Sequence, residues 1–224
     1  MIGEPSRSFA ADCLGYARQR LLRPRILALA AAVAACAVFV SEAPRPGFAI
    51  PAALILVWQF RLWDDLEDLP FDRIHHPDRV LGVTRMWGGF AATNAAGLLL
   101  AGAALAIVAD AAQALAYAAL VAGLAAGYRL MRTRPDRRLV RAHLVLVKYP
   151  VFVFVAAAPP VVSQAVPVAA VLYLGLCLFE VLDDPLLRGI RAGRALAVAE
   201  GITIAGSGAR TPRMALRNRL SGAG

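Results

Sequence analysis

The sequence predicts an all-α membrane protein, a polytopic helical bundle of about six transmembrane helices. Apolar residues make up 59% of the chain, whereas soluble domains contain about 45–50%. They come in runs of roughly 17–22 residues, the length at which an α-helix crosses a hydrocarbon core of about 30 Å. A chain of 224 residues is too short to bury so many apolar helices on all sides in water. The membrane is therefore the expected environment.

The apolar runs are separated by short polar or turn-forming segments. We expect membrane helices at 26–41, 47–63, 88–108, 111–130, 143–159 and 162–182. Residues 1–25 are expected to form a cytoplasmic N-terminal segment with a short amphipathic helix on the membrane surface. Residues 26–190 then form the transmembrane domain, and residues 191–224 form a basic cytoplasmic tail.

Basic residues gather on one side of the predicted membrane. The chain has 24 Lys and Arg residues, and when the N-terminus is cytoplasmic only Arg45 falls on the opposite side. This asymmetry follows the positive-inside rule and places both termini in the cytoplasm, with the chain in the inner (plasma) membrane. The net charge of +9 does not indicate nucleic acid, because the basic residues lie between apolar runs rather than on one soluble face.

Two groups of acidic residues lie at the predicted cytoplasmic ends of the second and sixth membrane helices. The first group is Asp64, Asp65, Glu67, Asp68 and Asp72. The second group is Glu180, Asp183 and Asp184. Both lie at helix C-termini, where the helix dipole disfavours each carboxylate by about 0.3–1 kcal/mol. Two groups placed against this effect indicate a divalent cation such as Mg²⁺, which prefers oxygen ligands.

The first acidic group has a helical spacing. On one continuous helix, Asp65, Asp68 and Asp72 would fall within about 60° of one another. Pro70 is expected to end or kink that helix, so that Asp72 approaches the metal from a loop. Solvated acids that balance nearby arginines are the alternative interpretation.

Two basic positions also have two interpretations. Lys148 is the only lysine and lies inside the fifth predicted helix, where a charge marks a candidate functional residue. It either contacts a phosphate or an acid of the two groups, or extends to the interface. Arg132, with the neighbouring Arg134, Arg137 and Arg138, either clamps a diphosphate or anchors the chain to anionic lipid.

At these residues the chain resembles the UbiA-type intramembrane prenyltransferase superfamily. Residues 64–72 resemble its first signature, N-D-x-x-D-x-x-x-D, with Asp64 in place of Asn. The following Arg73, His76-Pro77 and Arg79 resemble the Arg- and Pro-containing stretch of the family. Glu180 and Asp184 resemble its second acidic motif, and Tyr128 and Arg132 resemble its Y-x-x-x-K element. The resemblance is to a short, divergent member that lacks the last helices.

The resemblance implies a Mg²⁺-dependent enzyme that transfers a prenyl group from a polyprenyl diphosphate to an acceptor, often an aromatic ring. Mg²⁺ would neutralise the diphosphate as the allylic C–O bond ionises. The catalytic, metal-ligating residues are expected to be Asp65, Asp68, Asp72, Glu180 and Asp184. Substrate contacts are expected from Asp64, Arg79, Tyr128, Arg132, Lys148 and Asp183.

Three other functions are weighed against this one. A non-catalytic homologue would keep the bundle without turnover. A divalent-cation transporter is disfavoured because both acidic groups lie at one interface rather than near the bilayer midplane. A phosphatidyl-type transferase is disfavoured because its Asp-Gly and Ala-Arg elements are absent from residues 64–72.

Overall fold

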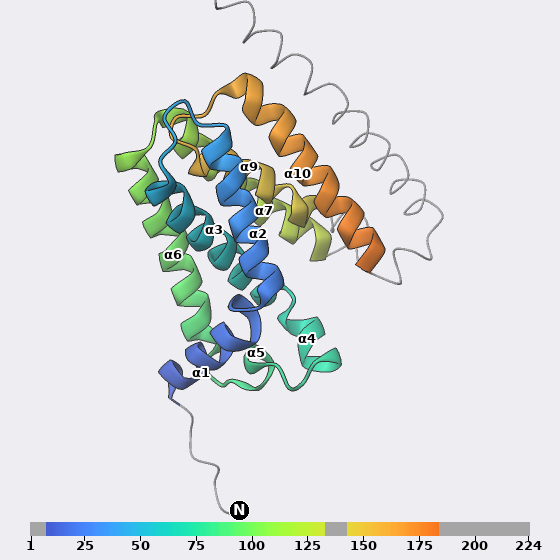
Figure 1. Ribbon diagram of the computed structural model, residues 1–224. Coiled ribbons are helices and arrows are strands. Elements are labelled where there is room, and N and C mark those ends of the chain that lie inside the picture. Colours follow the sequence, from blue (N-terminus) through green and yellow to red (C-terminus); the bar gives the residue numbers. More distant parts are fainter. Residues whose placement is uncertain (1–7, 133–142, 184–224) are drawn as a thin grey trace, which may run out of the picture.

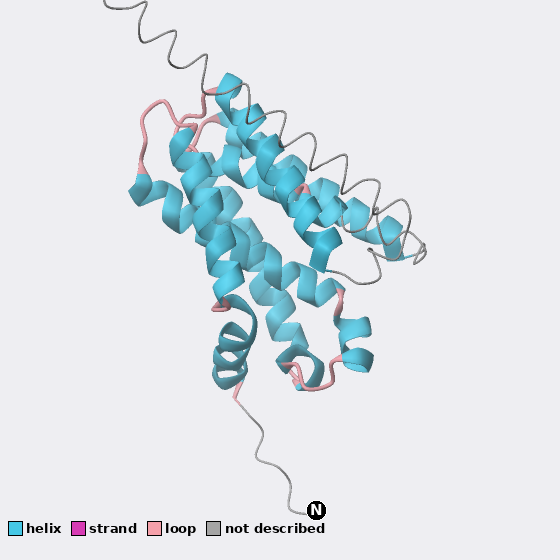
Figure 2. Cartoon of the chain, turned by 45° about the vertical axis from the view of Figure 1, so that its right-hand side comes forward, coloured by secondary structure: helices cyan, strands magenta, loops and turns pink. Residues whose placement is uncertain are grey.

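The computed structural model describes residues 8–132 and 143–183 of the chain. These residues form helices joined by short loops, without a β-strand and with one isolated bridge between Ser41 and Pro160 (Figure 2). The predicted all-α class is confirmed for this part of the chain. The predicted boundary at residue 190 and the tail of residues 191–224 lie outside the described residues.

The helices follow the predicted apolar runs with shifts of a few residues. Two short elements come first, α1 (Phe9–Tyr16) and the π-helical turn η1 (Ala17–Leu21). The long helices are α2 (Pro24–Phe39), α3 (Pro46–Glu67), α6 (Trp87–Val108), α7 (Ala111–Arg132) and α10 (Val162–Asp183). The remaining short helices are α4 (Leu69–His75), α5 (Val80–Val83) and α9 (Lys148–Ala156). Prolines occupy the first turns of α2, α3 and α4, where a missing N–H costs no intrahelical hydrogen bond.

The number of candidate membrane spans is lower than the predicted six. In the described residues, four helices are long and apolar enough to cross a membrane, namely α3, α6, α7 and α10. The N-terminal elements and α2 make a fifth if the pair Phe9–Leu21 and Pro24–Phe39, bent by 72°, is one broken span. The fifth predicted run forms only a shorter apolar helix, His143–Ala156. That helix extends about 21 Å and ends at Ala156, after which the extended backbone of Ala157 leads toward two prolines.

The bundle has two ends that differ in charge. At one end, which we call the charged end, α3 and α7 finish and α2 and α6 begin. The short helices α1, α4 and α5 also lie at this end (Figure 1). At the opposite end, backbone hydrogen bonds join the loop after α2 to the loop before α10. Glu42 N donates to Pro159 O over 3.0 Å, and Val161 N donates to Val40 O over 2.7 Å. These bonds fix the ends of α2, α9 and α10 relative to one another.

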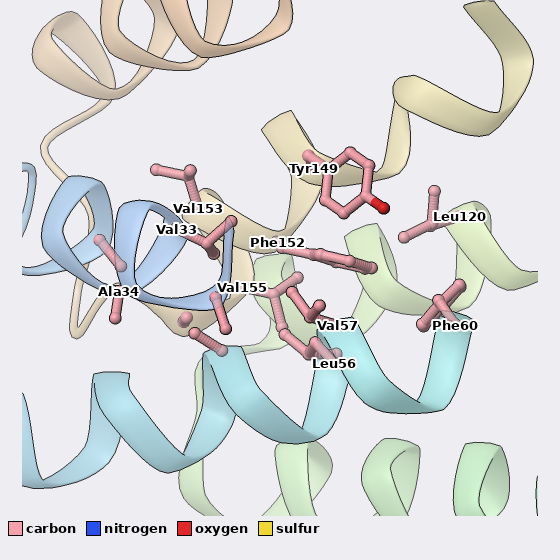
Figure 3. Close-up of a cluster of buried hydrophobic side chains, with 14 of the residues drawn as sticks. Val33, Ala34, Leu56, Val57, Phe60, Leu120, Tyr149, Phe152, Val153 and Val155 are labelled. Atoms are coloured by element: carbon pink, nitrogen blue, oxygen red, sulfur yellow. The ribbon is translucent and has the colours of Figure 1, made fainter. Parts of the chain in front are cut away.

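The short helix α9 forms the centre of the main hydrophobic core, because it packs against α2, α3, α7 and α10. Its Phe152 is fully buried and meets Phe60 of α3 edge to face, with ring centroids 5.0 Å apart. Figure 3 shows these rings among aliphatic side chains from α2 and α7. Gln113 closes the end of α9, since its amide Nε2 donates to the carbonyls of Phe154 and Ala157. The carbonyl of Phe154 lies in the last turn of the helix, where carbonyls have no partner within the helix.

The outer faces of α6 and α10 are apolar and exposed in the isolated chain. Leu99 and Ile107 of α6 are 75% and 83% exposed, and Val166 of α10 is 65% exposed. Exposed apolar side chains on helices of spanning length are the surface that a lipid environment would cover. Together with the buried core, they support a membrane-embedded helical bundle.

A smaller hydrophobic cluster holds the N-terminal helix against the charged end. It joins Tyr16 of α1 to Leu62, Leu69, Leu81 and Phe90 of α3, α4, α5 and α6. A buried hydrogen bond from Thr84 Oγ1 to Asp12 Oδ2, 2.5 Å long, adds a polar contact. The short helix predicted in residues 1–25 therefore exists as α1, and it is packed against the residues that carry the first acidic motif.

Candidate functional site

The first acidic motif is divided between two helices. Helix α3 ends at Glu67, Asp68 is the junction, and α4 begins at Leu69. The break lies just before Pro70, whose ring disfavours a continuous helix through this point. Asp72 lies on α4 and not on a loop as expected. The arrangement of Asp65, Asp68 and Asp72 on one continuous helical face is therefore not formed.

Asp64 is the centre of a buried polar network inside the bundle. Its Oδ2 is ion-paired with Nζ of Lys148 on α9, and its Oδ1 accepts a hydrogen bond of 2.5 Å from the Tyr128 hydroxyl on α7. All three side chains are buried. Of the two interpretations of Lys148, pairing with an acid is the one observed, and extension to the interface is not. Three residues predicted as substrate contacts thus converge on one another.

Asp65 points to a different side of α3 and binds the N-terminal elements. Its Oδ2 accepts hydrogen bonds from the Tyr16 hydroxyl at 2.9 Å and from Nε of Arg20 at 2.8 Å. Its Oδ1 is ion-paired with Arg20 and with Arg61, whose Nη2 is 3.1 Å away. Asp65 is 3% exposed, so its charge is neutralised almost entirely within the protein.

Asp72 and Asp65 line the same small pocket, although they belong to different helices, and the side chains around it leave no space for a water molecule. Arg79 holds Asp72 through an Nη1–Oδ1 distance of 2.5 Å. The pocket between them is lined by both carboxylates and by Tyr16, Gln19, Arg20, Arg79 and Leu81. We call it the Asp65–Asp72 pocket. Two of the five predicted metal-ligating acids are therefore brought together, along with the predicted substrate contact Arg79.

The other predicted site residues are placed less completely. Arg132, whose side chain is 67% exposed, contacts Glu67 with its Nη2 2.7 Å from Oε2. Glu180, half-buried on α10, lies within electrostatic range of the Tyr149 hydroxyl, as Asp64 does. Asp183 is the last residue of α10. Asp184 and the arginines Arg134, Arg137 and Arg138 lie outside the described residues.

A larger cavity of about 240 Å³ adjoins the Asp65–Asp72 pocket at the charged end. Five arginines line it, and the sole acidic side chain in its lining is Asp78. We call it the arginine cavity. Its arginines are Arg20, Arg23, Arg25, Arg61 and Arg79. Arg20 and Arg79 line both spaces, so the two form one continuous acidic and basic region.

Several of these contacts were not expected from the sequence. Arg61 lies four residues before Asp65, a spacing that places both side chains on one helical face and could have been recognised. Tyr16 and Arg20 lie more than forty residues from Asp65 and carry no local signal that pairs them with it. Arg23 and Arg25 were assigned only to topology.

The donor set fits Mg²⁺ in part. Mg²⁺ is typically held by one or two carboxylates with substrate phosphates and water, and the Asp65–Asp72 pocket presents two carboxylates to one space. Within the described ranges, however, there is no group of three or more Asp, Glu, His or Cys side chains that could hold a metal ion. The remaining ligands would therefore come from a phosphate-bearing substrate.

No protein-family model, curated protein or solved structure matches this chain. The resemblance of residues 64–79 to a prenyltransferase signature therefore stays a prediction from the sequence.

Proposed function

We propose that the chain is a UbiA-like membrane prenyltransferase that binds a polyprenyl diphosphate at the charged end of its bundle, with this end facing the cytoplasm. One observation carries the proposal. Asp65 and Asp72, from separate helices, share a pocket with Arg20 and Arg79 beside a cavity lined by further arginines. Carboxylates for a metal ion and guanidinium groups for phosphate oxygens are the two partners that a magnesium diphosphate requires.

The paired state of these side chains fits a site that exchanges partners. Arg20 and Arg79 now neutralise Asp65 and Asp72. Asp65 and Asp72 would hold Mg²⁺, and Arg20 and Arg79 would bind the phosphate oxygens, so no buried charge would be left unpaired. The bound Mg²⁺ supplies charge neutralisation that makes diphosphate a better leaving group.

The chain's own residues bind and orient the substrate. Arg20 and Arg79 line the same pocket as the two carboxylates and would bind the diphosphate at the end of the bundle. The prenyl chain then extends along the apolar helices, whose surfaces exclude water from the allylic carbon. The network of Asp64, Tyr128 and Lys148 is buried and does not line either space. Its role is to fix α3, α7 and α9 relative to one another.

The experiment measures thermal stability of the full chain in detergent with Mg²⁺, with geranylgeranyl diphosphate, and with both. A ligand at 100 times its Kd stabilises by about 2.7 kcal/mol. We expect the combination to raise the Tm by more than the sum of the separate shifts. Asp72→Asn should remove the Mg²⁺-dependent part, whereas Glu42→Gln, an exposed acid at the opposite end, should preserve it.

The outcomes separate the alternatives. Stabilisation by Mg²⁺ alone, without further effect of the diphosphate, would indicate a cation carrier and overturn the proposal. An Asp72→Asn response equal to that of the wild type would also overturn it. Release of inorganic diphosphate on addition of aromatic acceptors supports an enzyme. Binding of the prenyl diphosphate without release of diphosphate, whichever acceptor of a broad panel is added, supports the non-catalytic homologue.

A further inference from the structure

We infer that the arginine cavity is a metal-independent binding site for the phosphate group of a membrane amphiphile. The cavity lies where four segments meet, and each contributes charge. Arg20 comes from η1, Arg23 and Arg25 from the start of α2, Arg61 from α3, and Arg79 from the segment between α4 and α5. Segments distant in sequence thus line one basic space that is partly open, which simple positive-inside placement does not require.

The acids around the cavity do not balance its arginines. Asp65 neutralises Arg20 and Arg61, and Asp72 neutralises Arg79. Among the described residues, Arg23 and Arg25 form no ion pair, and the Nε of Arg23 donates to the backbone carbonyl of Gln19 at 2.8 Å.

Counting Asp65, Asp72 and Asp78 against the five arginines leaves an excess of two positive charges. An anionic phosphate group would therefore balance the cavity.

A second observation at Arg61 also indicates a missing acceptor. Its Nε is buried and has no hydrogen-bond partner in the described part of the chain. Buried donors without acceptors are uncommon in folded proteins and call for an explanation. Arg61 lines the cavity, and a phosphate there would offer several oxygen acceptors. Guanidinium groups suit this ligand because their planar N–H donors match phosphate oxygens.

The size and surroundings of the cavity favour a phosphate that carries an apolar chain. Its volume of about 240 Å³ is below the roughly 300–1,000 Å³ of pockets that enclose a whole drug-sized ligand, so it would hold only a head group. Leu22 and Leu27, beside the cavity arginines in sequence, are 48% and 38% exposed. Ile26 lines the cavity itself, so an apolar side chain lies beside the arginines, as binding of an amphiphile requires.

Two sources supply this chemistry, namely the head group of an anionic phospholipid and the diphosphate of a prenyl substrate. The inference does not require the transferase activity, because binding here involves arginines and no metal ion. The two proposals can therefore fail separately: the proposed function requires cooperation between Mg²⁺ and diphosphate, whereas the arginine cavity must bind its ligand in the presence of a metal chelator.

The test titrates the full chain in detergent, with EDTA present, and follows thermal stability. One arm uses phosphatidylglycerol with phosphatidylcholine as the uncharged comparison, and a second arm uses geranylgeranyl diphosphate with geranylgeraniol. Inorganic phosphate forms a third arm that lacks an apolar chain. We expect at least one of the anionic amphiphiles to bind, with phosphate alone binding at least tenfold more weakly.

The decisive variant is Arg23→Ala combined with Arg25→Ala. Both side chains are exposed and form no ion pair with any other described residue, so the fold should persist. Each basic residue near an anionic lipid surface contributes appreciably to binding, and we expect the affinity to fall at least tenfold. The matched control, Arg73→Ala with Arg85→Ala, removes two exposed arginines from the same end, outside the cavity lining.

Equal affinity in the two double variants would overturn the assignment, since binding would then depend on overall charge. Absence of binding by both amphiphiles in the wild type would overturn it as well. If the wild type binds only phosphatidylglycerol, the cavity is assigned to a lipid head group. If it binds geranylgeranyl diphosphate, the cavity is assigned to the substrate.

Discussion

The ammonium group of Lys148 on α9 is ion-paired with the carboxylate of Asp64 on α3, and both side chains are buried among apolar residues of the bundle. The signature that residues 64–72 resemble begins with a neutral Asn, and here it begins with an acid. A buried carboxylate at that position requires a compensating cation, and the only lysine of the chain supplies it. The buried acid Asp64 and the buried base Lys148, each unusual inside a membrane helix, therefore explain each other.

The first prediction concerns this pair. Lys148→Met keeps an unbranched side chain but leaves Asp64 buried without its cation, and we expect a loss of about 3–5 kcal/mol in the free energy of unfolding. Adding Asp64→Asn removes the unpaired charge and keeps an acceptor for Tyr128. The double variant should therefore recover a large part of the loss. Denaturant unfolding in detergent measures all three proteins, and a double variant as unstable as the sum of the single variants would contradict the coupling.

The second prediction concerns the other partner of Asp64. Tyr128→Phe removes the hydrogen bond of 2.5 Å to this carboxylate and should destabilise by about 1.5–3 kcal/mol, as expected for a bond to a charged group. Tyr117→Phe is the matched control on the same helix, because its hydroxyl donates to the neutral carbonyl of Leu98 at 3.0 Å. We expect about 0.5–1.5 kcal/mol there. The same unfolding measurement would refute the difference if the two variants lost equal stability.

The sequence predicted the helices well because apolar length is a local property. Each of the six apolar runs became helical, and two residues, Ala109 and Asp110, separate α6 from α7. The span count failed where helix length depended on its ends. The helix from His143 stops at Ala156, ahead of two prolines, and its end is closed by Gln113 from another helix. That contact joins residues about forty positions apart and leaves no local pattern.

The site was predictable in its residue types and less so in its pairing. The acids of residues 64–72 and Arg79 were recognised by motif, and two of the acids do share a pocket with that arginine. The motif could not reveal that Asp64 and Asp65 belong to two different networks, one inside the bundle and one toward α1. Adjacent residues on a helix are rotated by about 100°, so this separation follows from geometry. The identity of the partners, such as Arg20, depends on tertiary packing.

The third prediction concerns two glycines of α7 that lie about one turn apart. A Cβ added at Gly127 would collide with the side chain of Leu144, whose Cδ1 would be 2.9 Å away, whereas a Cβ at Gly123 would meet nothing within 4 Å. Gly127→Ala should destabilise by about 1–3 kcal/mol through overpacking. Gly123→Ala should be neutral or stabilising by up to about 1 kcal/mol because alanine favours the helix. Equal Tm values for the two variants would show that Leu144 moves aside without cost.

The last prediction separates the two acids of the shared pocket. Asp65 bonds to Tyr16 and Arg20, so it anchors the N-terminal helix, whereas Asp72 bonds to Arg79. Asp65→Asn removes a charge that these donors contact, each such bond being worth about 1.5–3 kcal/mol. The N-terminal elements should then open at least tenfold more often, and trypsin should cleave after Arg18 or Arg20 correspondingly faster.

Asp72→Asn is the matched control for this experiment, since it removes the same charge from the same pocket but breaks a bond to Arg79 and not one to the N-terminal segment. Mass spectrometry of the tryptic fragments over time gives the two cleavage rates, and equal rates would mean that Asp65 is not the anchor. If the rates differ as expected, loss of ligand binding in an Asp65 variant combines two effects, because the N-terminal segment that carries Arg20 is released together with the carboxylate. Asp72 is then the residue at which a direct effect on metal and diphosphate binding can be measured.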